Sequence, residues 1–198
     1  MSPAPVLERV YLEMKTRLRE GRYPMGSRLE ATRIADELHA SMTPVRDVLN
    51  RLAGEGLVQA YPGDGFSVPT LDEATIREIL EWNSHILLHV LRSNSPPGQI
   101  TNRLSHPMNT AERTADLFHR IATWHENREF VAAIASNNDR LAPLRAKEDS
   151  IFSDIAHEVT ILEDAFNLND VKRMASLVRS YHRRRTRMAS RYIQMLKR

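Results

Sequence analysis

The clearest chemical potential in this sequence lies in residues 41–46. Ser41 and Thr43 offer hydroxyl groups and Arg46 offers a guanidinium, and such groups hydrogen-bond to phosphate oxygens and to the edges of bases. Thr43 and Pro44 predict a helix start, because threonine caps helices and proline is favoured at the first helical position. We therefore expect a helix whose first turn presents these donors.

Two short amphipathic helices must position this segment. Apolar residues recur at helical spacing on both sides of a tight turn over residues 39–42; they are Ala31, Ile34, Ala35 and Leu38, then Val45, Val48, Leu49 and Leu52. Residues 57–61 and 66–68 predict two strands joined by a turn over residues 62–65. A preceding helix has one apolar face, made by Leu7, Val10, Tyr11, Met14 and Leu18, and ends at Gly21. This layout predicts a winged helix-turn-helix of three helices plus a β-hairpin wing, a fold that binds DNA.

Charge is distributed unevenly along the chain. The formal net charge of the 198 residues is +3, but residues 1–70 have a net charge of zero, residues 71–178 of −5 and residues 179–198 of +8. A few well-placed cations must therefore serve any contact of the first domain with nucleic acid. The chain has no cysteine, which excludes disulfides and thiolate metal sites. It shows neither a signal peptide nor an apolar run of membrane-spanning length, so we expect a cytoplasmic protein without a membrane partner.

The first third of the chain resembles the GntR family of bacterial transcription regulators. The resemblance lies in three segments in the order and spacing of the family; they are Gly21-Arg22-Tyr23-Pro24-Met25-Gly26-Ser27-Arg28-Leu29, Ser41-Met42-Thr43-Pro44-Val45-Arg46 and Gly54-Glu55-Gly56-Leu57-Val58. It implies that Arg33 and Arg46 contact DNA. The full set of DNA-binding residues that we predict is Arg33, Ser41, Met42, Thr43, Pro44, Arg46, Arg51, Gly63, Asp64 and Gly65.

Two residues depart from the family pattern. Met42 stands where an arginine or another polar residue is usual, and Asp64 stands at the tip of the wing, where a basic residue is common. Each lost phosphate contact lowers non-specific affinity and flattens its salt dependence. We therefore expect a weaker or unusually specific DNA binder, in which Met42 contacts the methyl group of a thymine.

The second half of the chain predicts an all-helical bundle. A capping box at residues 70–73 opens a helix that runs to about Arg92, and residues 93–108 are expected to form a loop. Further helices are expected over residues 110–126, 129–141, 150–167 and 170–196. The chain is thus predicted to be mainly α, with a DNA-binding domain over residues 1–70 and a helical effector-binding and dimerisation domain over residues 71–198.

This half resembles the FCD ligand domain of the FadR-type branch of the family. The resemblance lies in Asp116-Leu117-Phe118-His119-Arg120-Ile121 and in Ala165-Phe166-Asn167-Leu168-Asn169-Asp170. Many FCD domains hold a divalent metal through one aspartate and three histidines, but three of those positions are filled here by Ala115, Val159 and Tyr181. We therefore predict no cofactor and no metal, and an effector pocket lined by Trp82, Asn83, Asp116 and His119.

One alternative keeps a metal in a displaced site. Asp116 and His119 share a helix face, and His157 and His182 lie near the missing ligands in sequence, so the four could serve a small helical metal-binding protein or metalloenzyme. No nucleophile and base accompany them, and we expect no enzyme. The prediction is instead a ligand-responsive transcription regulator, a repressor that binds a short palindromic operator as a homodimer and responds to a small-molecule effector such as an organic acid.

The basic C-terminal segment has three possible roles. It could be a second DNA contact or anion site, it could pair subunits through the acidic middle of the chain, or it could be a solvated helix end, which the helix dipole favours. Its members are Arg179, Arg183, Arg184, Arg185, Arg187, Arg191, Lys197 and Arg198.

Overall fold

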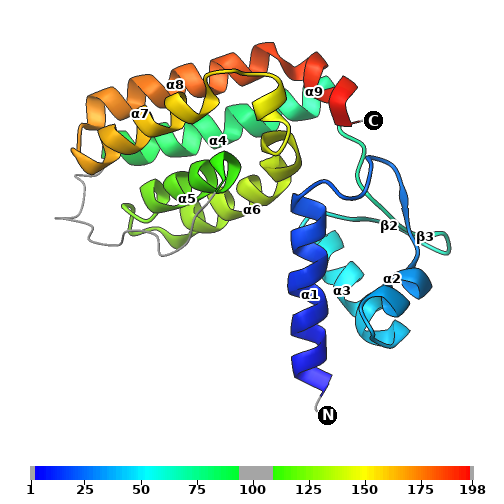
Figure 1. The fold of residues 1–198 in the computed structure, drawn as a ribbon. Coiled ribbons are helices and arrows are strands. Elements are labelled where there is room, and N and C mark those ends of the chain that lie inside the picture. The colour runs from blue at the N-terminus through cyan, green and yellow to red at the C-terminus, as the bar shows by residue number, and fades with distance from the viewer. Residues whose placement is uncertain (1–2, 94–108, 197–198) are drawn as a thin grey trace. The chain divides into compact units, whose positions relative to one another are not determined.

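The structure is a computed structural model that describes residues 3–93 and 109–196. The expected loop over residues 93–108 lies outside these ranges except for Ser93, as do Lys197 and Arg198 of the basic C-terminal segment. The chain divides into two compact units, residues 1–71 with 194–198 and residues 72–193 (Figure 1). Within the described ranges, every helix is too short or too polar to cross a bilayer.

The first unit is a winged helix-turn-helix. Its elements are α1 (Pro3–Arg19), β1 (Arg28–Leu29), α2 (Ala31–Glu37), α3 (Met42–Gly54), β2 (Gln59–Tyr61) and β3 (Gly65–Ser67). The strands form an antiparallel sheet in the order β1-β3-β2, with Arg28 opposite Ser67 and Tyr61 opposite Gly65. The predicted wing is therefore present, and it gains a third strand, β1, that the sequence pattern did not indicate.

The core of this unit is built from the predicted apolar stripes. Met14 of α1 and Val45, Val48 and Leu49 of α3 are completely buried, and α1 packs closely on α3. Burial of one stripe per helix fixes how each helix is rotated about its own axis, so the polar residues of α3 must face away from the core. At the wing tip, Gly63 and Gly65 have φ angles of +80° and +94°, which glycine adopts without strain.

The start of α3 corrects one sequence prediction. The N-cap is Ser41 and the first helical residue is Met42, so the expectation that Thr43 caps the helix and Pro44 begins it is wrong by two residues. Pro44 is the third helical residue, where a backbone N–H would also have no partner within the helix, so its ring is tolerated.

The second unit is an all-helical bundle, as predicted. Its elements are α4 (Glu73–Ser93), α5 (Thr110–Ala122), α6 (Arg128–Arg145), the short 3-10 helix η1 (Glu148–Ser150), α7 (Ile155–Asn167), α8 (Val171–Arg187) and the first part of α9 (Ala189–Leu196), whose residues 194–196 are assigned to the first unit. The first and last long helices of the bundle, α4 and α8, pack side by side, and α5 packs on α6. Asn109 and Glu112 form a capping box that begins α5.

Several helix boundaries in this unit differ from the sequence pattern. The single helix expected over residues 170–196 ends at Arg187 and resumes at Ala189, because Met188 leaves helical geometry. Helix α6 continues through Pro143 to Arg145, and α7 begins at Ile155 after η1 instead of near Ser150. The mainly helical fold class, a winged helix followed by a helical unit, is confirmed.

Candidate nucleic-acid interface

The exposed face of α3 carries the polar residues that the sequence singled out. Ser41, Met42, Thr43 and Arg46 are all exposed, while Val45 and Val48 between and after them are buried. The hydroxyl of Ser41 makes no capping hydrogen bond, so it is available to a ligand. Because α3 begins at Met42, Arg46 is its fifth residue and not part of the very first turn.

Arg46 differs from the other arginines of this face because its charge is not used within the fold. Across the described parts of the chain, no hydrogen bond, ion pair or ring contact involves its guanidinium, whereas Arg33 donates to Glu37 at 2.9 Å. Glu37 in turn accepts from Arg17 at 2.7 Å, and these two hydrogen bonds lower its pKa. The negative charge on Glu37 therefore offsets the positive charge of Arg33. The charge of Arg46 is not offset in this way, so its guanidinium can pair with an external anion.

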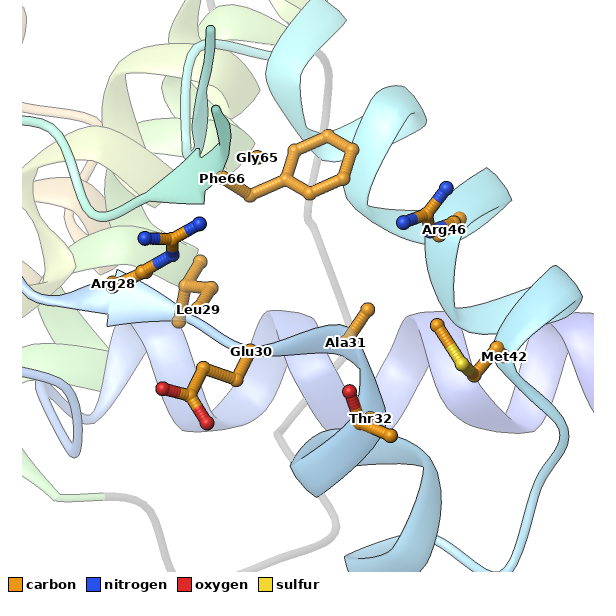
Figure 2. A pocket seen from close by; sticks show the side chains of 9 residues that line it. All are labelled: Arg28, Leu29, Glu30, Ala31, Thr32, Met42, Arg46, Gly65 and Phe66. Atoms are coloured by element: carbon orange, nitrogen blue, oxygen red, sulfur yellow. The ribbon is translucent and has the colours of Figure 1, made fainter. Parts of the chain in front are cut away.

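A hollow of about 260 Å³ separates α3 from the wing. Figure 2 shows Met42 and Arg46 on one side of it, Arg28 and Phe66 on the opposite side, and Thr32 at the start of α2 below. Two guanidinium groups thus border the same hollow, that of Arg28 from β1 and that of Arg46 from α3. Such an opening, with cations on both rims, is suited to a phosphate backbone or to the edge of a base.

Arg28 is a residue that the sequence analysis missed. Its Nη2 donates to the backbone carbonyl of Asp64 at 3.0 Å and lies 3.7 Å from the carboxylate of the same residue. Both side chains are mostly exposed, so the ion pair itself contributes little, but the hydrogen bond ties the wing tip to β1. The positive charge of Arg28 also offsets the charge of Asp64 at the tip. The sequence carries no usable signal for the strand there, because a polar residue followed by an apolar one, Arg28-Leu29, is too short a pattern.

Arg51 lies on a different face of α3. Five residues separate it from Arg46, which corresponds to a rotation of roughly 140° about the helix axis. Its guanidinium carbon lies 3.5 Å from the centroid of the Tyr11 ring, and its nitrogens lie 3.5 Å from carboxylate oxygens of Glu8 and Glu55. The structure therefore places Arg51 against α1 and apart from the predicted DNA-binding residues around the hollow.

Glu55 binds the C-terminal end of α3 to α1. It accepts a hydrogen bond from the hydroxyl of Tyr11 at 2.8 Å and another from Lys15 at 3.0 Å. Burial alone would raise the pKa of Glu55, but the hydrogen bonds from Lys15 and Tyr11 outweigh burial and lower it. These contacts fix α3 at the end opposite to its exposed donors.

The four residues predicted to line an effector pocket lie on α4 and α5 of the helical unit. Asn83 is fully buried and Asp116 is half-buried, with burial raising the pKa of Asp116. Asp116 lies 3.8 Å from Arg120, its neighbour along α5. Trp82 is 54% exposed and His119 is also exposed, so these two side chains do not join Asn83 in the interior.

Asn83 contacts a buried histidine of α8. Its side-chain oxygen Oδ1 lies 2.9 Å from Nε2 of His182 and its Nδ2 is buried without a partner among the described residues, while Nδ1 of His182 lies 2.7 Å from the carbonyl oxygen of Val178. Burial lowers the pKa of His182 to about 3, so its ring is neutral and carries one proton. A carbonyl only accepts, so the proton is on Nδ1 and Nε2 is an acceptor. The amide of Asn83 must therefore be turned by about 180°, so that its NH₂ group donates to Nε2 in place of Oδ1.

This geometry corrects the alternative of a displaced metal centre. The described ranges include Asp116, His119, His157 and His182, yet they contain no group of three or more histidine or carboxylate side chains able to hold a metal ion. Both ring nitrogens of His182 make hydrogen bonds inside the bundle, and His119 and His157 are exposed. The four residues of the alternative metal site are thus divided between the interior and the surface.

The basic C-terminal segment is also divided. Arg179, Arg183, Arg187 and Arg191 are exposed, but Arg184 pairs with Asp154, and Arg185 is 1% exposed and pairs with Glu148 and Glu158. The interpretation as a wholly solvated helix end is therefore wrong for Arg184 and Arg185.

Known proteins resemble this chain in two ways: a family model matches the first unit, and solved structures share the fold of both units. Residues 7–68 match the family of bacterial regulatory proteins called the gntR family. The chain is 29% identical over 77 residues to YdhC, an uncharacterized HTH-type transcriptional regulator of Bacillus subtilis, which is 39% of this chain and 34% of that protein. The chain thus spans about a third of the length of that curated relative, and about half (47%) of another from Agrobacterium vitis.

Two solved structures share the fold over almost the whole chain. A transcriptional regulator GntR from Rhodococcus sp. RHA1 matches with a TM-score of 0.75 at 16% identity, covering 92% of this chain and 96% of that one. Escherichia coli McbR/YncC matches with a TM-score of 0.69 at 17% identity, covering 96% and 98%. At these identities the likeness concerns the fold alone.

Proposed function

We propose that this chain, whose N-terminal domain belongs to the GntR family of bacterial regulatory proteins, is a transcription regulator that binds double-stranded DNA through α3 and the wing. The observation that carries the proposal is the exposed guanidinium of Arg46, which has no partner in the described parts of the chain and borders the hollow beside the wing. A buried stripe on one side of α3 and free donors on the other are the division that major-groove binding requires.

The proposed interface has two parts. Ser41, Thr43 and Arg46 contact phosphates and base edges from α3, and Met42 contacts a thymine methyl. Residues 63–65 of the wing approach the neighbouring backbone, where the glycines allow close contact. Arg33, whose side chain is 79% exposed on α2, contacts a phosphate, and Pro44 lies in the first turn of α3 beside the contacting residues. We add Arg28, which borders the same hollow, and we leave Arg51 out because its charge is used by α1.

The finer features of the function follow from this mode of binding. A single recognition helix covers only a few base pairs, so we propose a homodimer that binds a palindromic operator. The helical unit, which resembles the FCD domain of the FadR-type branch, would pair the subunits and bind an effector in the bundle. The protein would repress by occupying its operator in the cytoplasm until the effector changes its affinity for DNA.

Two measurements test the proposal. Sequencing the DNA that the purified protein selects from a random pool should yield a short inverted repeat. On a duplex with that sequence, Arg46→Ala should weaken binding by about 1–3 kcal/mol, which is roughly 5- to 150-fold.

Arg51→Ala is the matched control, because it removes the same charge from the same helix. It should leave DNA affinity within about threefold of the parent and should lower stability through the lost contact with Tyr11. If both variants bind the operator equally well, or if Arg51→Ala is the weaker of the two, the assignment of the DNA-binding face fails.

A further inference from the structure

Helix α8 carries a stripe of cations on its exposed side. The helix packs on α4 and α7 (Figure 1), and each residue that it leaves exposed is positively charged or bears a hydroxyl group. These residues, which we call the basic stripe, are Lys172, Arg173, Ser176, Arg179, Ser180, Arg183 and Arg187. In α-helical geometry they fall within an arc of roughly 120° and extend over roughly 22 Å of the helix. One face of α8 is thus cationic along its whole length.

The charges of the basic stripe are not used within the fold. In residues 3–93 and 109–196, no hydrogen bond, ion pair or ring contact involves the side chain of any of its five cations. Two neighbouring arginines of the same helix behave differently, since Arg184 pairs with Asp154 and Arg185 pairs with Glu148. The arginines of α8 are therefore divided into some that hold the bundle together and others that face outward unpaired.

The basic stripe is unfavourable for α8 by itself. Lys172 and Arg173 lie in the first turn, where the helix dipole disfavours a positive charge. Arg179, Arg183 and Arg187 recur every four residues, and like charges at this spacing repel one another. The dipole would favour Arg187 at the C-terminal end, but it does not account for cations along the whole helix. An anionic partner would offset these repulsions.

The composition of the basic stripe favours a nucleic acid over a protein as this partner. Protein interfaces have an apolar core in which aromatic residues are enriched, whereas α8, which the structure describes completely, has no exposed apolar residue. Interfaces with DNA are more polar and more positively charged, and arginine, lysine and serine all hydrogen-bond to phosphate oxygens. Double-stranded DNA carries one negative charge per about 1.7 Å of its axis, which supplies more phosphates than the five cations require.

We propose that the basic stripe binds the phosphate backbone of double-stranded DNA, as a contact separate from α3 and the wing. The contact is independent of base sequence, because every base pair presents the same phosphates. The proposal rests on the proposed function in taking DNA as the partner. It extends that function, because the helical unit then contributes directly to the affinity for DNA.

The test is fluorescence anisotropy of the full chain on a labelled random duplex, with the salt concentration varied from about 50 to about 200 mM. Each phosphate contact contributes about 0.9 to the slope of log K against log salt. Arg179→Gln combined with Arg183→Gln should therefore flatten the slope by about 1.8 units. The affinity ratio of parent to variant should then fall about twelvefold across this salt range. The variant should melt at or above the temperature of the parent at low salt, because repulsion between exposed charges is relieved.

Arg92→Gln combined with Arg128→Gln is the matched control, because it removes two exposed arginines from α4 and α6. This control has the same net charge as the stripe variant, so it separates a local contact from a general change in charge. It should keep the slope of the parent.

Two results would overturn the proposal. The first is an equal slope for the stripe variant and the control. The second is a stripe variant that binds DNA like the parent but dissociates from dimer to monomer in sedimentation velocity, since the stripe would then contact a second copy of the chain.

Arg46→Ala in the same assay separates this proposal from the assignment of α3. A flatter slope for Arg46→Ala alone would keep DNA binding through α3 and reject the contact at the basic stripe. A flatter slope for the stripe variant alone would keep the contact at α8 and reject the assignment of α3. A parent that binds no DNA would reject both.

Discussion

Lowering the pH from 7 to 5 should destabilise the helical unit through a single buried residue, His182. Its side chain is 4% exposed, and its neighbours are neutral or positive: the amide of Asn83, the ring of Phe118, and the guanidinium groups of Arg145 and Arg185. Burial, reinforced by the repulsion of these two cations, lowers the pKa of His182 from 6.5 to about 3. The folded protein therefore excludes a proton that the unfolded chain accepts.

The sign and size of the effect follow from proton linkage. Above pH 6.5 neither state is protonated, so His182 adds no pH dependence. Between pH 6.5 and 3 only the unfolded state binds the proton, so stability falls as the pH falls, by up to about 1.4 kcal/mol per pH unit. The loss from pH 7 to pH 5 is about 2 kcal/mol, and it depends mainly on the unfolded pKa, because the folded pKa of about 3 lies well below this range.

Tryptophan fluorescence can isolate this effect. The chain contains two tryptophans, Trp82 and Trp124, and both lie in residues 72–193, so the signal reports unfolding of the helical unit alone. We suggest urea unfolding at pH 5, 6 and 7 for the parent, for His182→Gln and for His157→Gln, which changes an exposed histidine. The parent and His157→Gln should lose about 2 kcal/mol more than His182→Gln over this range. Parallel pH dependence in all three proteins would refute the reasoning.

Other perturbations test the remaining contacts. Arg28→Met should speed amide hydrogen exchange at the wing tip and weaken DNA binding without lowering the melting temperature, because it removes the hydrogen bond to the carbonyl of Asp64; unchanged exchange would contradict this. Met42→Arg should steepen the dependence of log K on log salt by about one unit, as measured by fluorescence anisotropy on random DNA, and an equal slope would mean that this position does not face the duplex. Glu148→Gln should cost about 3–5 kcal/mol of unfolding free energy, because it leaves Arg185 short of a buried counter-charge, and a loss below about 1 kcal/mol would argue against that pairing. Chelation should leave the melting temperature unchanged, whereas loss of one equivalent of metal together with stability would restore a metal site.

The elements that sequence could predict are those set by local patterns. The apolar stripes at helical spacing located α2 and α3, and the cluster of glycine and proline located the wing turn, because burial and turn geometry act over a few residues. Strand β1 was missed because two residues carry too little periodicity and owe their pairing to β3, which lies far along the chain.

The roles of individual arginines were harder to predict, because partners distant in sequence decide them. Arg46 and Arg51 look alike on α3, but Tyr11 and Glu8 of α1 contact only Arg51. Arg185 resembles its exposed neighbours in the basic segment, yet Glu148, 37 residues away, pairs with it in the interior. The sequence thus indicated which residue types could bind an anion, while long-range packing determined which of them remain free.

The two faces of α3 share no residue, and this separation has an evolutionary consequence. Val45, Val48, Leu49 and Leu52 hold the helix in the domain, whereas Met42, Thr43 and Arg46 are exposed and take no part in the core. Substitutions on the exposed face can therefore accumulate at little cost in folding. With DNA binding as proposed, a lineage carrying this domain could acquire new target sequences by changing a few surface residues, and a designer could redirect it in the same way without repacking the protein.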